Sequence, residues 1–216
     1  MTKQICKFTC LAFIAVTLFG CSSKTGDEKT GNGNGKAAAK SQATPQETYN
    51  NLKNAAENDN WSEALLYVTP DSQHIMLGGM IFVSTMVVGF SEDKAKQESF
   101  EKLLKQHGVN VDDKSSPATL DDIEEVMKAL VGNVKDKGAC LSALMDWMKK
   151  NMADKAGQLT EPITKIEIGE VKIDGDTATA TITVDGKPDD PTIFAKIDGK
   201  WYIDILASEK AKKSGK

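Results

Sequence analysis

Arginine is missing from this chain, and all 27 of its basic residues are lysines. The planar guanidinium that reads guanine edges and clamps phosphates through two hydrogen bonds is therefore absent. The charge balance points the same way, because residues 46–206 contain 17 lysines and 28 acids, a net charge of −11. Affinity for nucleic acid comes mostly from neutralising phosphate charge. We therefore expect no nucleic-acid partner.

Histidine and cysteine are scarce, which limits metal chemistry. The chain has two histidines, His74 and His107, and four cysteines. Structural zinc sites take four ligands, mostly cysteine and histidine, at short characteristic spacings. These few residues cannot form such a site without several carboxylates. We expect no metal and no cofactor.

The N-terminus has the organisation of a secretion signal that ends in cysteine. A basic start precedes an apolar stretch over residues 8–19, and Cys21 comes directly after Gly20. This order resembles the lipobox of bacterial lipoproteins. The resemblance implies that residues 1–20 are a signal peptide and that Cys21 receives the lipid and begins the mature protein.

The implied partner of Cys21 is membrane lipid, such as palmitate. The implied location is a bacterial membrane, preferably the outer one, with the rest of the chain facing the periplasm or the cell exterior. A single uncleaved membrane anchor is the alternative. Its apolar run of about a dozen residues is shorter than the ~20 that span a bilayer.

The sequence also gives predictions for the remaining cysteine and for the two ends of the mature chain. Cys6 and Cys10 would leave with the signal, so Cys140 would be the one unmodified cysteine. We expect it to be buried and structural. Residues 21–44, rich in glycine and polar residues, predict a flexible tether with a reach of roughly 25–30 Å. Residues 207–216 predict a basic, disordered tail.

The folded part is predicted to be one domain over residues 45–206, and helical up to about residue 155. Thr44, Pro45 and Glu47 form a capping box with proline at the first helical position. Apolar residues then recur at helical spacing. Further helix starts are expected at Asn60, Thr69, Ser91 and Thr119, with a last helical run over residues 140–152.

The segment 75–90 carries no charge. It is shorter than a normal membrane span, and a helix that is apolar all round is typical of the centre of a globular protein. We favour a buried core helix, with the wall of a ligand pocket and a membrane-contacting surface as alternatives. The small residues Gly78, Gly79, Ser84 and Gly89 would let another backbone or an apolar ligand approach closely.

After Pro162 the apolar period changes to two, which predicts strands. Asp-Gly pairs at 174–175, 185–186 and 198–199 predict hairpin turns, because glycine accepts the positive φ that these turns require. Four strands, the last two over Thr192–Ile197 and Trp201–Leu206, should therefore form an antiparallel meander. The residues expected to face the helices are Ile166, Ile168, Ile182, Val184, Phe194, Trp201, Ile203 and Ile205.

Four motifs carry a family resemblance. They are TPQETY at 44–49, NDNWSEAL at 58–65, TPD at 69–71 and DGKWYID at 198–204. Together they resemble small bacterial lipoproteins of the nuclear-transport-factor-2-like superfamily, over about residues 45–72 and 163–206. The resemblance implies an α+β cone, in which N-terminal helices cover a curved antiparallel sheet of about four strands. Residues 75–155 would form a helical insertion.

The resemblance leaves two classes of function open. One is a noncatalytic binding or interaction module of the cell envelope, which takes an apolar ligand or an envelope protein. Its candidate pocket-lining residues are Trp61, Met80, Phe82 and Tyr202.

The alternative is a small-molecule enzyme of the isomerase or dehydratase type. Its candidate acids and bases are Asp71, His74, Tyr202 and Asp204, since buried carboxylates become useful bases when their pKa rises. No spacing in the chain matches an enzyme motif, so we assign no catalytic residue.

Overall fold

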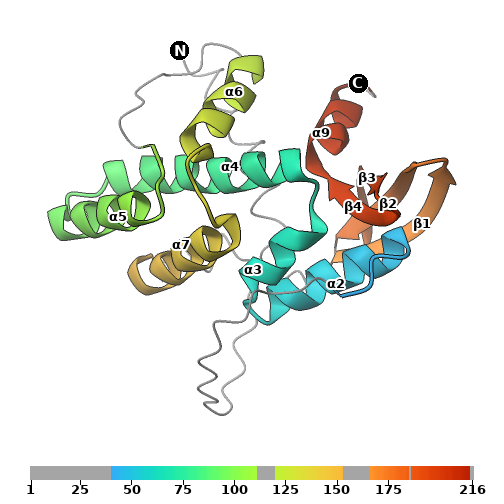
Figure 1. Cartoon of the computed structure of the whole chain (residues 1–216), viewed down its shortest axis with the longest axis horizontal. Helices are drawn as coiled ribbons and strands as arrows, with labels where there is room; N and C mark the ends of the chain where they lie inside the picture. The colour runs from blue at the N-terminus through green and yellow to red at the C-terminus, as the bar shows by residue number, and fades with distance from the viewer. Residues whose placement is uncertain (1–39, 111–119, 153–165, 185, 215–216) are drawn as a thin grey trace.

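The computed structural model describes residues 40–110, 120–152, 166–184 and 186–214. Helices make up the N-terminal part and a four-stranded antiparallel sheet lies towards the C-terminus (Figure 1), which confirms the α+β class. The predicted signal peptide 1–20 and the predicted lipidation site Cys21 lie outside the described residues. The elements are α2 (Pro45–Glu57), α3 (Trp61–Ala64), η1 (Leu65–Tyr67), α4 (Pro70–Gly89), α5 (Lys94–Gln106), α6 (Leu120–Val131), α7 (Lys137–Asn151), β1 (Ile166–Asp174), β2 (Thr177–Val184), β3 (Lys187–Ile197), β4 (Lys200–Asp204) and α9 (Ile205–Ser214).

Three helices begin at the caps expected from the sequence. Thr44 Oγ1 accepts a hydrogen bond from the Glu47 N–H (3.1 Å), and Thr69 Oγ1 accepts one from the Ser72 N–H (3.3 Å). In both cases proline occupies the first turn, where its missing N–H costs nothing. Asn60 caps α3 in the same way. These starts are therefore set by residues within one turn.

The predicted cap of α5 is wrong by two residues. Asp93 Oδ1 accepts from the Lys96 N–H (3.1 Å) and is the N-cap, whereas the Ser91 hydroxyl accepts from the Asp93 N–H (3.2 Å). Serine and aspartate both favour this role, and here the carboxylate takes it. The cap expected at Thr119 lies outside the described residues.

The sheet is a meander in the order β1-β2-β3-β4, with every neighbouring pair antiparallel. Asp198 and Gly199, which join β3 to β4, both have positive φ (50° and 77°), as a two-residue type I′ turn requires. Gly175 and Gly186 also have positive φ in the other two hairpins. The predicted meander and its Asp-Gly hairpins are confirmed.

Strand β3 begins at Lys187, five residues before the predicted start at Thr192. It pairs with β2 from Lys187 onwards but with β4 only from Ile193. The first half of β3 therefore pairs with β2 but not with β4. Proline is tolerated at such an unpaired edge, because no partner strand needs its missing N–H. Pro188 and Pro191 interrupt the strand pattern of the sequence, so this half of β3 was not predicted.

The secondary structure predicted after Asp204 is wrong. Strand β4 stops at Asp204 rather than Leu206, and the supposed disordered tail forms α9 as far as Ser214. Asp204 Oδ1 accepts from the Ala207 N–H (3.0 Å), which makes Asp204 the N-cap of this helix. Helix formation thus begins at a strand residue.

Contacts with β3 hold α9 in place. The Ser208 hydroxyl accepts from the Ile193 N–H (2.8 Å), and Lys212 Nζ lies 3.1 Å from Asp190 Oδ2. The lysine-rich segment is therefore ordered by partners on the acidic strand beside it.

The sheet face that packs on the helices is largely as predicted. Ile182, Phe194, Trp201 and Ile203 are buried, and Ile168, Val184 and Ile205 pack partly buried against them. The side chain of Ile166 lies outside the described set. Ala178 and Ala180 are also fully buried on this face and alternate with exposed threonines along β2. Their small side chains do not stand out as core residues in the sequence.

The outer edge of β4 is covered by the start of the domain. The Trp201 N–H donates to the Gln42 carbonyl (2.9 Å), and Gln42 Nε2 donates back to the Trp201 carbonyl (2.8 Å). The Thr69 N–H donates to the Ile203 carbonyl (3.0 Å). Residues 40–44, assigned to the tether from sequence, therefore belong to the folded domain, because an open sheet edge needs backbone partners.

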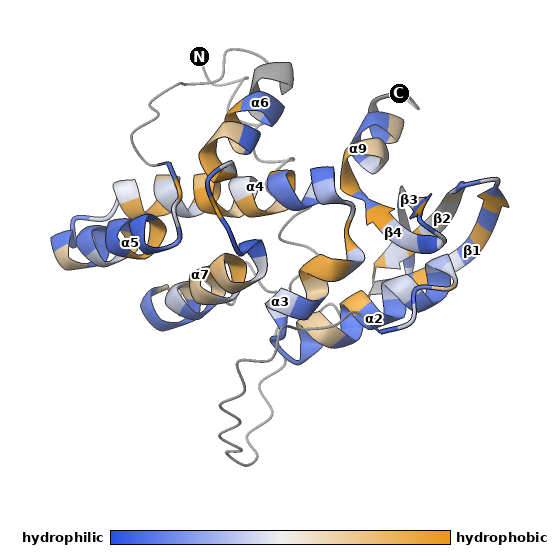
Figure 2. Ribbon diagram, viewed as in Figure 1, coloured by the Kyte–Doolittle hydropathy of each residue, from blue (hydrophilic) through white to orange (hydrophobic). Residues whose placement is uncertain are grey.

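Helix α4 is the central helix of the molecule. It contacts α5, α6, α7 and α9 (Figure 1), and after a polar first turn its residues are mostly apolar (Figure 2). By length and composition it could cross a membrane, yet 44% of its most apolar window is buried within the protein. Met76, Leu77 and Ile81 are at most 3% exposed. The prediction of a buried core helix is confirmed for the side of α4 that carries these three residues.

Candidate functional site

The four residues predicted to line a pocket lie in different environments. Trp61 on α3 and Met80 on α4 are each 3% exposed and form part of the hydrophobic core. Phe82 and Tyr202 are half-buried. Tyr202 follows Trp201 on β4, so its side chain points to the opposite face of the sheet. A pocket shared by all four stays a prediction.

A depression of about 450 Å³ lies elsewhere, on the surface of α5. It is lined by Glu98, Glu101, Lys102, Lys105 and Gln106. Ligand pockets are usually concave and mostly apolar. Charged side chains from a single helix provide no such wall, so we assign no binding site there.

Three of the four candidate acids and bases, Asp71, His74 and Asp204, make local contacts within the fold. Asp71 is 74% exposed and lies 3.9 Å from Lys128 Nζ, and His74 Nδ1 lies 2.8 Å from the carbonyl oxygen of its own turn of helix. Asp204 caps α9. Tyr202 lies beyond Trp201 on the other face of the sheet. Among the described residues we see no convergent acid–base set.

Ser72 is the polar residue that sequence reasoning missed. It is fully buried, and its hydroxyl accepts from Thr69 Oγ1 (2.8 Å) and the Ile205 N–H (2.9 Å) while it donates to Asp204 Oδ1 (3.3 Å). It therefore joins the start of α4 to the junction of β4 and α9. Only its position two residues after the first-turn proline marked it in the sequence.

Metal and thiol chemistry find no support in the described part of the chain. No group of three or more histidine, cysteine, aspartate or glutamate side chains there could hold a metal ion. Cys140 is 2% exposed, as predicted for a structural cysteine. Burial and, to a lesser extent, the nearby Asp136 carboxylate raise the pKa of its thiol to about 11, which suppresses the reactive thiolate.

The feature that stands out is an apolar face of α4 that no other described element covers completely. It consists of Ile75, Phe82, Val83, Met86 and Phe90, which we call the α4 apolar face. Separations of seven residues (75 to 82), four (82 to 86 and 86 to 90) and three (83 to 86) place them on one side of the helix. Met86 is 48% exposed and Phe90 is 89% exposed, while the other three are half-buried. The exposure therefore increases towards the C-terminal end of α4.

Glycines distinguish the two sides of this helix. A Cβ at Gly78 would lie 2.8 Å from Met127 Cβ, so α6 crosses α4 closely at this point. At Gly79 and Gly89 no heavy atom of the other described elements lies within 4 Å of such a Cβ. Ser84 is fully buried and its hydroxyl contacts Met148 Sδ (3.3 Å). Close approach, predicted for all four small residues, is thus observed at Gly78 and Ser84.

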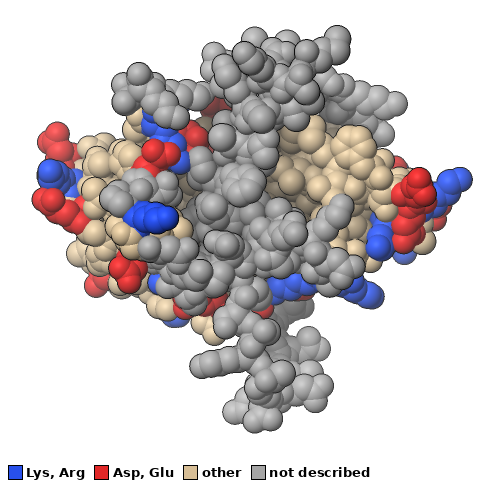
Figure 3. All heavy atoms as spheres, turned by 180° about the vertical axis from the view of Figure 1, so that it is seen from behind, with Lys and Arg blue, Asp and Glu red and all other residues tan. Residues whose placement is uncertain are grey.

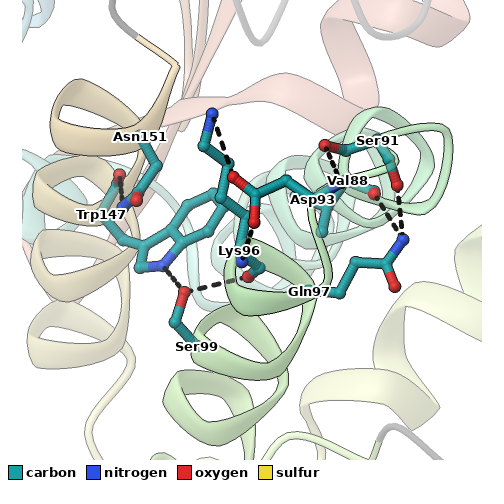
Figure 4. A network of polar contacts seen from close by, with 8 residues as sticks. All are labelled: Val88, Ser91, Asp93, Lys96, Gln97, Ser99, Trp147 and Asn151. Atoms are coloured by element: carbon teal, nitrogen blue, oxygen red, sulfur yellow. Dashed lines mark hydrogen bonds and ion pairs between the residues drawn. The ribbon is translucent and has the colours of Figure 1, made fainter.

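The turn that carries Phe90 is held by polar contacts (Figure 4). Gln97 Nε2 donates to the carbonyls of Ser91 (2.7 Å) and Val88 (3.5 Å), and so joins the end of α4 to α5. Asp93 caps α5 two residues beyond Ser91. The turn therefore has a defined shape, and it presents Phe90 to solvent.

Helix α7 packs against α5, the helix that follows this turn. Trp147 Nε1 donates to the Ser99 hydroxyl (3.0 Å), and the Trp147 ring packs against Phe100 at a centroid distance of 4.8 Å. Seen from behind, the half of the molecule that holds this end shows a broad uncharged surface bordered by charged side chains (Figure 3). We call the segment from Met86 to Lys94 the α4–α5 corner.

No protein-family model, curated protein or solved structure matched this chain in the comparisons.

Proposed function

We propose that this protein is a lipid-anchored lipoprotein of the bacterial envelope whose globular part is a noncatalytic binding or interaction module. The observation that carries the anchor is the order of basic residues, apolar stretch, Gly20 and Cys21. The alternative proposal of an enzyme loses support from the positions of its candidate residues. Asp71 is exposed and Asp204 is used as a helix cap.

The α4 apolar face supports an interaction role. Large exposed apolar side chains that lie together mark surfaces for partners, ligands or membranes. Phe90 and Met86 form such a group on a helix whose other side is core. A binding module needs this kind of surface, whereas a solvated structural domain does not.

We also propose that the domain belongs to the nuclear-transport-factor-2-like superfamily. Its support is the packing of the two segments that carry the resemblance. Helix α2 packs on β4 and β1, and Val68 forms a bridge with Ile203. The helices of the insertion, α5 to α7, gather around α4 at the other end of the molecule (Figure 1).

Metabolic labelling tests the anchor. The full chain is expressed in a bacterial host with an alkyne analogue of palmitate, and incorporation is read after detergent extraction. We expect the label in the wild-type chain and in Cys10→Ser, and none in Cys21→Ser. The control is matched because Cys10 lies in the predicted signal peptide. Label in the Cys21→Ser chain, or a protein that still begins at Met1, would contradict the proposal.

Native mass spectrometry of the protein purified from its own cells tests the binding role. We expect a retained apolar molecule whose occupancy falls in a Met86→Glu variant and stays unchanged in Ile173→Glu. Ile173 is the matched control because it is also an exposed apolar residue, 59% exposed, but lies on the sheet. Turnover of that molecule by the pure protein would favour the enzyme.

A further inference from the structure

The α4–α5 corner places a large aromatic side chain in water at a fixed position. Phe90 is 89% exposed, and the turn around it is held by Gln97 and the Asp93 cap. An ordered turn cannot readily fold inwards to cover the ring. The apolar surface continues from Phe90 to Met86 along the same side of α4, so a partner would meet an apolar tip rather than a single residue.

Charge distinguishes this end of the molecule from the rest. Residues 86–110 and 137–152, which comprise the corner, α5 and α7, contain seven lysines and five acids, a balance of +2. The other described residues contain 11 lysines and 19 acids, a balance of −8. An anionic surface would therefore repel the acidic body more than the end of the molecule that carries α5 and α7. Within the corner itself Glu92 and Asp93 outnumber Lys94, so the positive balance comes from the lysines of α5 and α7 beside the apolar tip. Lysines near apolar side chains are typical of a segment that enters the lipid interface.

The position of the anchor allows this contact. Cys21 and Lys40, the first described residue, are 19 positions apart. Fully extended, such a segment spans roughly 60–70 Å, whereas the 20 residues of α4 are about 30 Å long. A chain anchored at Cys21 can therefore bring the far end of α4 to the bilayer that holds its own lipid.

We propose that the α4–α5 corner docks on an anionic lipid bilayer, with Phe90 and Met86 inserted in the interface. This inference deepens the proposed function and rests on the anchor at Cys21. Docking gives the tethered domain one orientation. The sheet, with the open edge of β1, then faces away from the lipid.

Site-specific fluorescence tests the docking. The acylated full-length chain is reconstituted in vesicles of phosphatidylethanolamine and phosphatidylglycerol, with an environment-sensitive nitrobenzoxadiazole probe on Phe90→Cys. Cys140 is buried and does not compete for the label. Ile173→Cys carries the probe in the matched control. Both sites are exposed, so neither substitution removes core packing.

We expect the emission of the Phe90 probe to shift to the blue, and spin-labelled lipids to quench it. The probe at Ile173 should show neither change. Equal behaviour of the two probes would overturn the docking. So would a shift at Phe90 that follows the protein-to-lipid ratio and resists lipid quenching, because a second copy of the chain would then be the partner.

The intact mass of the protein shows whether it is acylated, so the docking and the anchor can be judged separately. An acylated protein whose Phe90 probe is not quenched contradicts the docking and leaves the anchor standing. A chain without acyl groups contradicts the anchor. With Cys6, Cys10 and Cys21 replaced by serine, so that the probe reports on position 90, quenching in excess vesicles would still support the corner as a lipid-binding surface. Absence of quenching would overturn both proposals.

Discussion

The close crossing of α4 and α6 can be tested with two adjacent glycines. Gly78→Ala places a Cβ 2.8 Å from Met127 Cβ and 3.0 Å from Met127 Cα and O. These atoms belong to the backbone or lie next to it, so no change of rotamer relieves the contact. Gly79→Ala adds the same methyl group one residue later, where no heavy atom of the other described elements lies within 4 Å.

The two variants should differ in sign or at least clearly in size. Replacing glycine by alanine inside a helix stabilises by about 1 kcal/mol, and this is the full effect expected at Gly79. Overpacking a core contact costs about 1–3 kcal/mol, which at Gly78 opposes that gain. Gly78→Ala should therefore be less stable than Gly79→Ala by about 1–3 kcal/mol.

Urea unfolding of the mature chain, followed by tryptophan fluorescence, measures this difference. Trp61 and Trp201 are each 3% exposed, so their emission reports on the core. With a urea slope of about 2 kcal/mol/M, the two midpoints should lie about 0.5–1.5 M apart. Equal midpoints for the two variants would refute the close crossing of α6 at Gly78.

Three further outcomes are expected. Ser72→Ala should lower the free energy of unfolding by about 1–3 kcal/mol, because the Ile205 N–H loses its buried acceptor. Ser41→Ala is the control, since the Ser41 hydroxyl makes only an exposed hydrogen bond, to Glu47. Equal urea midpoints of the two variants would count against a stabilising role of the buried Ser72 hydroxyl. Tyr49→Phe should keep or raise stability by about 1 kcal/mol, because the buried Tyr49 hydroxyl has no hydrogen-bond partner among the described residues; a large loss would reveal a bound water. The Cys140 thiol should resist a disulfide reagent at pH 8 until the chain unfolds. Burial raises the pKa of this thiol to about 11 in the folded state. Its contribution to the free energy of unfolding should therefore be complete below pH 9 and decrease as the pH rises through about 11. Rapid modification of the folded protein would contradict its burial.

Local patterns were reliable where the cause lies within a few residues. A proline after a threonine marked the starts of α2 and α4, and the Asp-Gly pairs marked the hairpins. Alternation along β2 identified Ile182 as a core residue. Each of these signals depends on backbone geometry or on one hydrogen bond close in sequence.

The candidate site was only partly accessible in this way. The sequence marked 75–90 as apolar all round, and such a helix carries no signal for which side meets the core. The positions of α6 and α7 decided that Leu77 and Ile81 are covered while Met86 and Phe90 are not. The predicted pocket residues were likewise divided among the core, the half-buried side of α4 and the other face of the sheet.

The sequence by itself determined the α+β class, the caps of α2, α3 and α4, and the turns, because these depend on neighbouring residues; it is also the sole basis of the proposed anchor at Cys21. Tertiary structure alone decided that residues after Asp204 form a helix, that Gln42 covers the edge of β4 and that one side of α4 stays open. Their partners are far apart in the chain. The Ser72 hydroxyl and the Ile205 N–H, for instance, are separated by 133 residues and meet only when α4 packs against the end of the sheet.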